Sequence, residues 1–332
     1  MAQSIRVSSR PPTYPAPEFP PRKPKLFART PPALFPVLLG LLGVGLALRK
    51  GLDVLALSGG LADLFLGAVG AVWVFAVVAY GTKLARRPAV VTEDMRVLPG
   101  RGGVAAISLG GMAMAAALAP FAPRLAAWLL ILSLLVHGVQ AVVLVLVLRP
   151  LPQPARQVNP TLHLSFVGPI VGAVAALALG WTEFAALLFW AVLPVAMLIW
   201  VLSAVQFARE VSPAPLRPML AIHLAPASLM ATVAAQTGQG GLAIVLAVLA
   251  GTYLAILLVS LRWLLISGFT PIWVSLTFPL AAFTSAMFTL GWDWPGVVGL
   301  ILALGLVPWI AYRVFKMWAT GSLAQRTNAA EA

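Results

Sequence analysis

Ten long apolar stretches follow one another along this chain, separated by short polar connectors. They cover residues 33–48, 61–82, 104–121, 125–148, 162–180, 183–207, 219–236, 241–261, 271–290 and 295–315. Each is close to the roughly 20 residues that an α-helix needs to cross about 30 Å of hydrocarbon. The pattern predicts an all-α integral membrane protein with ten transmembrane helices.

The predicted spans are of two alternating kinds. Even-numbered spans are long and rich in Leu, Val and Trp, which suits contact with lipid, whereas odd-numbered spans are shorter and carry smaller side chains and helix breakers. The breakers are Pro36, Pro169, Pro226 and Pro279 in four spans and Gly110-Gly111 in the remaining one. A proline inside a membrane helix leaves a carbonyl without its partner, which is tolerated beside other helices or a water-lined cavity. We therefore expect the odd-numbered spans to form an inner ring, in which these residues shape a pore.

The connectors group the spans into pairs. Linkers after odd-numbered spans are mostly tight, as at 180–182, 237–241 and 291–296, whereas linkers after even-numbered spans are longer and usually basic. The repeating unit is thus a helical hairpin of roughly 55 residues, a period that indicates architecture and not a local motif. Five such hairpins account for the ten spans.

Composition supports the same class of protein. Hydrophobic residues make up 61% of the 332 positions and charged residues only 9%, whereas about a quarter of a soluble domain is charged. The formal net charge of +13 could indicate nucleic-acid binding, so the location of the charge has to decide. All but three of the 22 Lys and Arg residues fall on one side of the predicted spans, the exceptions being Arg49, Lys50 and Arg124. By the positive-inside rule we expect both termini in the cytoplasm, and no nucleic-acid partner.

The predicted membrane domain covers residues 31–318 and has a tail at each end. Residues 1–30 are rich in Pro, Arg and Lys and contain no apolar run, which predicts a disordered cytoplasmic N-terminal tail and not a signal peptide. Residues 319–332 form the predicted cytoplasmic C-terminal tail.

Signatures of catalysis are missing from the sequence. The chain has no Cys, so it has neither disulfides nor thiolate metal sites. It also lacks an HExxH motif, a pair of Asp-rich motifs and a GxSxG elbow. We therefore expect no enzymatic activity, no cofactor and no bound metal.

Three segments carry a resemblance to a known family. They are TPPALFPVLLGLLGVGLALRK at 30–50, HLAPASL at 223–229 and, most specifically, PIWVSLTFPLAAFTSA at 271–286. They resemble the tellurite-resistance/dicarboxylate transporter family, which also contains the plant slow anion channels. The resemblance implies five helical hairpins with quasi-fivefold symmetry around a central pore, usually as a homotrimer, conducting or transporting anions. Its members differ among tellurite resistance, malate export and chloride or nitrate conduction, so the substrate does not follow from the fold.

The resemblance also assigns a role to Phe278, which matches the position of an aromatic gate in that family's pore. Phe278 lies seven residues beyond Pro271, so it is expected about 10 Å into the membrane core at ~1.5 Å per residue. A large apolar ring at that depth can close a narrow pore by keeping it dry. The alternative is that Phe278 packs against an even-numbered helix while Pro279 only bends the span.

The histidines each have two interpretations. His163 and His223 lie shortly after Pro160 and Pro218, near the cytoplasmic ends of their spans, where they are candidate pH-sensing groups at the cytoplasmic mouth. The alternative is hydrogen-bonded packing. His137, with Gln140, lies in the middle of an even-numbered span and is expected to join two helices.

Passage of small anions is the function that these features favour. The odd-numbered spans all begin on the cytoplasmic side, so their N-terminal dipoles and the basic linkers attract small inorganic or dicarboxylate anions. No charged residue lies deep in these spans, which favours weakly selective passage through a channel in the inner membrane. A proton-coupled dicarboxylate or tellurite-linked exporter remains an alternative. So does a non-conducting scaffold or sensor whose basic tail binds a partner or anionic lipid.

Overall fold

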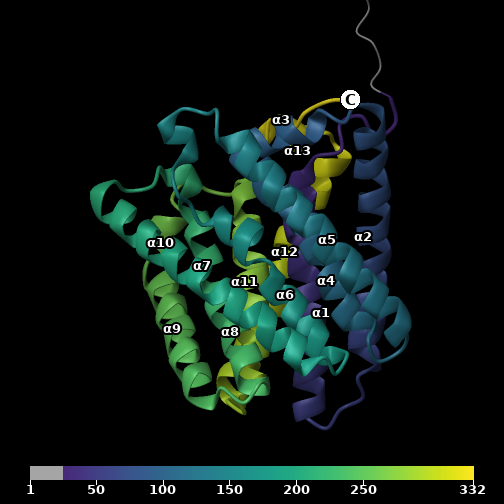
Figure 1. Ribbon diagram of the computed structural model, residues 1–332, viewed down its shortest axis with the longest axis vertical. Coiled ribbons are helices and arrows are strands. Elements are labelled where there is room, and N and C mark those ends of the chain that lie inside the picture. Colours follow the sequence, from purple (N-terminus) through teal and green to yellow (C-terminus); the bar gives the residue numbers. More distant parts are fainter. Residues whose placement is uncertain (1–24) are drawn as a thin grey trace, which may run out of the picture.

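The computed structural model describes residues 25–332, and within that range the chain forms helices and turns without a strand (Figure 1). In chain order the elements are η1 (Pro32–Leu34), α1 (Phe35–Val54), α2 (Gly60–Arg86), α3 (Val90–Arg96), α4 (Leu98–Leu118), α5 (Pro123–Leu148), η2 (Gln153–Arg156), η3 (His163–Val167), α6 (Pro169–Ala178), α7 (Thr182–Arg209), η4 (Ala214–His223), α8 (Leu224–Gln236), α9 (Gly240–Val259), α10 (Leu261–Leu264), η5 (Pro271–Leu276), α11 (Thr277–Thr289), α12 (Asp293–Ala319) and α13 (Ser322–Arg326). Most of the predicted N-terminal tail, residues 1–24, lies outside the described residues.

Nine helical segments of the described chain are long and apolar enough to cross a membrane. They are Pro32–Val54, Gly60–Arg86, Leu98–Leu118, Pro123–Leu148, Thr182–Arg209, Ala214–Gln236, Gly240–Val259, Pro271–Thr289 and Asp293–Ala319. The stretch predicted at 162–180 forms a shorter apolar segment, His163–Ala178. The prediction of a polytopic all-α membrane protein is confirmed.

The long segments fall into an inner and an outer set. In the most apolar stretch of the four long odd-numbered spans, from 72% to 89% of the residues are buried, whereas the range is 22% to 39% for the even-numbered spans. Helices α2 and α9 accordingly border opposite sides of the molecule, with α1, α4 and α8 between them (Figure 1). The inner position predicted for the spans with small side chains is confirmed for these four, because small residues let neighbouring backbones approach.

Four inner segments change helix type partway along. A tight 3-10 turn precedes the α-helix in η1–α1, η4–α8 and η5–α11, and a π-helical turn precedes α6. The four span prolines, Pro36, Pro169, Pro226 and Pro279, each fall in the first turn of the α-helix that follows. A proline costs little there, because the amide N–H that it lacks would have no partner inside the helix. The expected mid-helix bend is thus a change of helix type, and the N-terminus of the α-helix lies inside the span.

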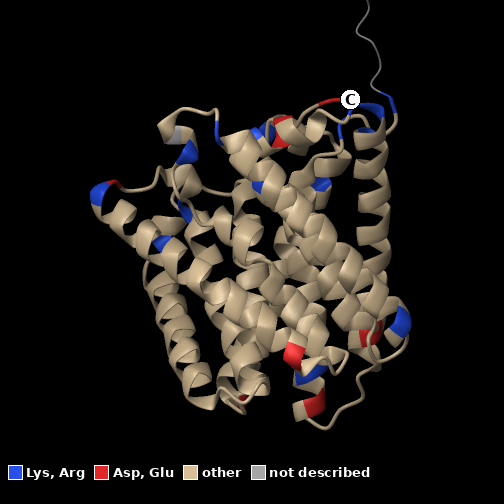
Figure 2. Ribbon diagram, in the orientation of Figure 1, with Lys and Arg blue, Asp and Glu red and all other residues tan. Residues whose placement is uncertain are grey.

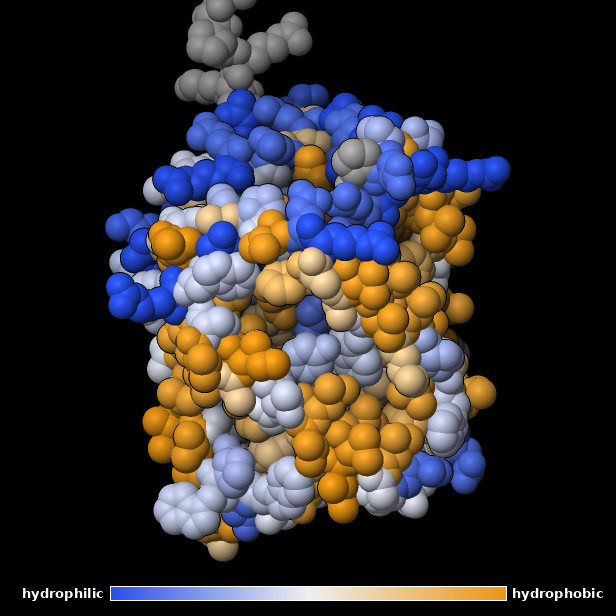
Figure 3. All heavy atoms as spheres, turned by 90° about the vertical axis from the view of Figure 1, so that its left-hand side faces the viewer, coloured by the Kyte–Doolittle hydropathy of each residue, from blue (hydrophilic) through white to orange (hydrophobic). Residues whose placement is uncertain are grey.

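Charged residues gather at the two ends of the molecule. Figure 2 shows Lys and Arg concentrated at one end, here called the basic end, where α2 and α12 finish. At the opposite end Figure 2 shows both basic and acidic positions. Arg49 and Lys50 lie near the end of α1 and Arg124 lies in the first turn of α5, and acidic residues lie in the first turns of α2, α7 and α12. Between the ends, hydrophobic side chains cover most of the face seen in Figure 3, below a hydrophilic band. This surface fits a lipid bilayer.

A buried ion pair fastens the basic end. Lys83 Nζ lies 3.1 Å from Asp94 Oδ2, and both side chains are fully buried. Tyr80 donates a hydrogen bond of 2.9 Å to the same carboxylate, and Lys83 donates one of 3.1 Å to the carbonyl oxygen of Thr30. The predicted span ends at residue 82 and leaves Lys83 in a connector, whereas α2 continues to Arg86 and buries its side chain. The pair ties α2 and α3 to the segment that leads into α1.

The C-terminal residues pack onto the same place. The amide of Ala330 donates a 2.8 Å hydrogen bond to Asp94 Oδ1, and the amide of Ala332 donates one of 3.1 Å to the carbonyl oxygen of Ala28. Leu323, in α13, is fully buried. Part of the predicted C-terminal tail thus belongs to the packed structure of the basic end.

Candidate functional site

Two cavities lie along the centre of the inner helices. The wide cavity, of about 340 Å³, is lined by residues of α1, α4, α6, α8 and α11. The narrow cavity, of about 50 Å³, is lined by residues from the first halves of the same five spans. A third cavity of about 20 Å³ lies beside them, between α6, α8 and α11. Every inner span therefore contributes to both main cavities.

Phe278 is the residue that these cavities share, since it lines all three. It lies in the first turn of α11, and only 8% of its surface is exposed. Its ring lies against α1 at Gly43, where an added Cβ would come within 3.1 Å of a ring carbon. The absence of a side chain at Gly43 gives the ring its room. Phe278 thus stands between the wide and the narrow cavity.

Two cations of α1 reach the wide cavity. Arg49 forms an ion pair of 2.7 Å with Asp63 and donates a 3.1 Å hydrogen bond to the carbonyl oxygen of Ala117. Lys50 donates a hydrogen bond to the hydroxyl of Thr289, and no carboxylate of the described chain forms an ion pair with it. The wide cavity therefore carries an uncompensated positive charge. The predicted span ends at residue 48 and leaves Lys50 outside it, whereas α1 continues to Val54.

The narrow cavity is mostly apolar and lies at helix N-termini. Its lining includes Pro36, Ala225 and Pro279, which belong to the first turns of α1, α8 and α11. The first amide of each of these α-helices donates a hydrogen bond to the 3-10 turn before it, so these ends contribute the positive field of the helix dipole and not free N–H groups. Three such ends meet at this cavity, close to Phe278, so the local field favours an anion.

The predicted pore-shaping residues take different positions. Pro36 and Pro279 line the narrow cavity and Pro226 lines the small one, whereas Pro169 is only partly buried and lines none of the three. Gly110 and Gly111 are buried away from these cavities. A Cβ on Gly110 would collide with the indole of Trp73, and one on Gly111 with the hydroxyl of Ser133. These glycines let α4 approach α2 and α5, so any effect on the pore passes through the position of α4.

His163 and His223 form a pair. His163 Nε2 and His223 Nδ1 are 3.0 Å apart, and the side chains are 2% and 6% exposed. Trp200 and Tyr253 of the outer helices pack on the two imidazoles. The two imidazoles are thus buried and packed, and their role at the cytoplasmic mouth stays a prediction. The pairing joins residues 60 positions apart, which the spacing along the chain did not indicate.

His137 joins two helices as predicted. Ser108 of α4 lies 2.9 Å from His137 Nδ1 and donates a 2.8 Å hydrogen bond to Gln140 Oε1, both residues of α5. These contacts connect an inner helix to an outer one, away from the central cavities.

Comparison with known proteins gives one family. The model of the SLAC1 family, described as voltage-dependent anion channel, matches residues 29–318. No curated protein matches the chain. The match covers the membrane spans and both central cavities, and it confirms the resemblance found in the sequence. The chain belongs to this family of voltage-dependent anion channels.

Proposed function

We propose that the chain is an anion channel in which small anions pass from the narrow to the wide cavity along the axis of the inner helices, past Phe278. The observation that carries this proposal is the position of Phe278 between two cavities that all five inner spans line. The segment His163–Ala178 then acts as the tenth span, and the ten spans form five hairpins with quasi-fivefold symmetry around the path.

The charges along the path support anions over cations. Among the described residues that line the two main cavities, Arg49 and Lys50 are the charged ones. The helix N-termini at the narrow cavity add positive potential without a cation that could hold an anion tightly. Conduction needs binding that is favourable enough for entry and weak enough for release.

The ring of Phe278 closes the path. It is large, apolar and packed against α1, so the region between the cavities excludes water and an anion cannot keep its hydration there. Movement of one side chain is enough to join the two cavities. A gate of this kind needs no charged residue.

The test is anion flux through the purified protein in liposomes. Replacement of chloride by nitrate, malate or tellurite on one side ranks the permeant ions directly. Passive flux down each gradient supports a channel. Uphill movement driven by a pH gradient would instead identify a proton-coupled dicarboxylate or tellurite-linked exporter, and absence of flux under all conditions would favour a scaffold or sensor.

A location and an assembly complete the proposal. The basic end faces the cytoplasm of an inner membrane, because Lys and Arg gather there (Figure 2). The assembly is a homotrimer, for which the family resemblance is the support. Mass measurement of the detergent-solubilised protein by light scattering gives the subunit number.

A further inference from the structure

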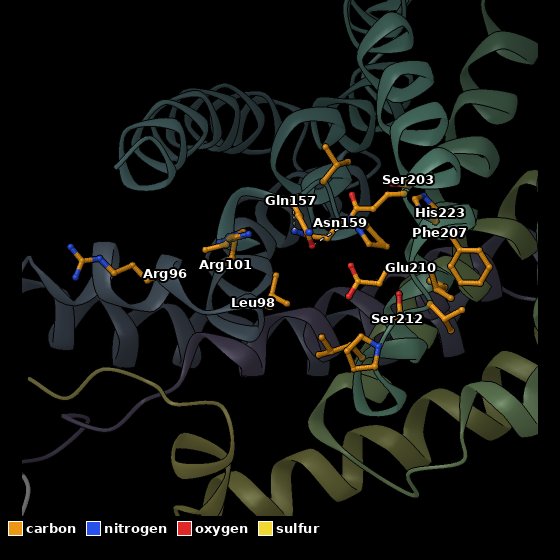
Figure 4. Close-up of a pocket in the computed structure, with 18 residues that line it drawn as sticks. Arg96, Leu98, Arg101, Gln157, Asn159, Ser203, Phe207, Glu210, Ser212 and His223 are labelled. Carbon is orange, nitrogen blue, oxygen red and sulfur yellow. Dashed lines mark hydrogen bonds between the residues drawn. The ribbon is translucent and has the colours of Figure 1, made fainter. Parts of the chain in front are cut away.

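A separate cavity of about 310 Å³ lies toward the basic end, outside the central path. It is here called the side cavity, and its walls come from the start of α4, the segment 155–160, the end of α7 and η4. Figure 4 shows its lining side chains. Phe278 does not line it, and it shares only Leu98 with the narrow cavity.

Arg101 is the notable residue of this cavity. Its side chain extends into the cavity, whereas that of Arg96 extends away (Figure 4). Arg101 is 2% exposed, and its Nε donates a 3.2 Å hydrogen bond to the carbonyl oxygen of Met95. No carboxylate within residues 25–332 forms an ion pair with it. A buried guanidinium without a counter-charge is costly, and an anion in the cavity would lower that cost.

The cavity offers further polar groups at its other walls. The hydroxyl of Ser203, in α7, is buried and has no hydrogen-bond partner in the described chain. Gln206 donates a 3.2 Å hydrogen bond to Gln157 Oε1, which braces α7 against the loop opposite. Glu210 is exposed and points its carboxylate toward the same space (Figure 4). The walls are thus held together around a buried guanidinium without an ion-pair partner and a buried hydroxyl without a hydrogen-bond partner in the described chain.

We propose that the side cavity is a binding site for a small oxyanion, a molecule with a carboxylate or phosphate group, that enters from the basic end. The planar guanidinium of Arg101 donates two parallel hydrogen bonds to such a group, and Ser203 supplies a further donor. The volume is far greater than a single halide requires, since one water occupies about 30 Å³ in the liquid. The rest of the ligand lies against Phe207, Leu216 and Leu220.

This site goes beyond the proposed conduction path and does not depend on it. The cavity nevertheless reaches the wall of that path. His223 lines the side cavity, and its partner His163 lines the small cavity beside Phe278. Binding is therefore measured separately from flux, so that failure of one proposal leaves the other standing.

The experiment is calorimetric titration of the purified full-length protein with inorganic phosphate and with succinate. We expect saturable binding of at least one probe, weakened roughly tenfold or more in Arg101→Gln, because a charge-assisted hydrogen bond is lost. Arg149→Gln and Arg124→Gln are the controls and should bind as the parent does, because both residues are exposed cations that line neither the side cavity nor the central cavities.

A second pair of variants keeps the test decisive if Arg101→Gln does not fold. Ser203→Leu replaces the hydroxyl donor by a bulkier apolar side chain and should weaken binding at least about tenfold, whereas Glu210→Gln removes a repelling carboxylate and should tighten it about threefold. Binding that is unchanged in Ser203→Leu, or no binding of either probe to the parent protein, would overturn the proposal. So would binding of dihexanoyl-phosphatidylglycerol alone, because it would identify a lipid headgroup in place of a soluble ligand.

Discussion

At the scale of single residues, two cations of α1 reach the wide cavity, and only Arg49 has an acidic partner. Lys50 is bound by the hydroxyl of Thr289 alone among the described side chains. A hydroxyl fixes the ammonium group without neutralising it, so the charge of Lys50 remains available to an anion in the cavity.

Lys50→Gln should therefore lower anion flux by about fivefold, which corresponds to roughly 1 kcal/mol of Coulomb attraction near water. The loss should shrink at high salt, because ions screen the charge. The measurement is chloride efflux from liposomes at two ionic strengths. Arg124→Gln is the matched control, because Arg124 is an exposed cation at the same end that lines neither main cavity. Equal losses in both variants would show that only general surface charge matters.

The ion pair of Lys83 and Asp94 governs stability instead of conduction. Lys83→Met should lower the free energy of unfolding by about 3–5 kcal/mol, because it leaves the Asp94 carboxylate buried without a counter-charge. Thermal unfolding in detergent measures the loss. Lys316→Met, at an exposed position near the end of α12, should change stability little. A melting temperature equal to the parent's in Lys83→Met would contradict the buried pair.

At the scale of elements, the inner spans are composite. Four of them begin with a 3-10 or π-helical turn and continue as an α-helix whose first turn contains a proline. The α-helix therefore begins inside the span. The prolines prevent the α-helix from extending backward, since proline has no amide N–H and disfavours α geometry in the preceding residue. The first turns of α1, α8 and α11 therefore lie at the narrow cavity.

Pro279→Ala and Pro226→Ala should let α11 and α8 extend toward the basic end and so change anion flux at similar expression. Pro169→Ala belongs to the same series. Pro194→Ala is the control, because Pro194 lies inside the outer helix α7 and is exposed. Flux is compared per molecule of reconstituted protein. Flux at the parent level in all three inner variants would remove the role given to the helix N-termini.

Sequence patterns predicted the elements well and their internal detail less well. Hydrophobicity and side-chain size are local properties, so the nine long spans and the inner position of the small-residue spans could be predicted. The turns that open the inner spans depend on neighbouring helices, and the pattern alone gave continuous helices there. Arg101 was expected in a connector, but α4 begins at Leu98 and carries it into the buried interior.

The missed polar contacts share one physical cause. His163 pairs with His223 across 60 residues, and Asp94 binds both Lys83 and the amide of Ala330. Such pairs form when tertiary packing brings distant segments together, and no spacing along one chain indicates them. The local sequence around each of these residues indicated no partner for its side chain. These side chains are buried only because distant segments of the chain pack against one another.

At the scale of the whole molecule, the basic end should face the cytoplasm. This chain has no Cys, so single cysteines report topology without background. Ser322→Cys, in α13, should resist an impermeant thiol reagent in intact cells and react after lysis. Ser58→Cys, in the exposed connector between α1 and α2, should react in intact cells and serves as the control. If Ser322→Cys reacts in intact cells and Ser58→Cys does not, the basic end faces outward and the proposed orientation is wrong.

The central claim is that Phe278 closes a path between the two main cavities. A pore-facing ring can be removed with little loss of packing, whereas a core ring cannot. Phe283 supplies the comparison, because it is a buried aromatic residue of the same helix that lines none of the three central cavities.

The most direct measurement is anion flux and thermal stability of Phe278→Ala beside Phe283→Ala in the same liposome and detergent preparations. We expect Phe278→Ala to raise flux severalfold at nearly unchanged stability. Phe283→Ala should instead lose about 3–5 kcal/mol of stability without a gain in flux. If Phe278→Ala loses stability as Phe283→Ala does and its flux stays at background, Phe278 is a packing residue and the central claim is wrong.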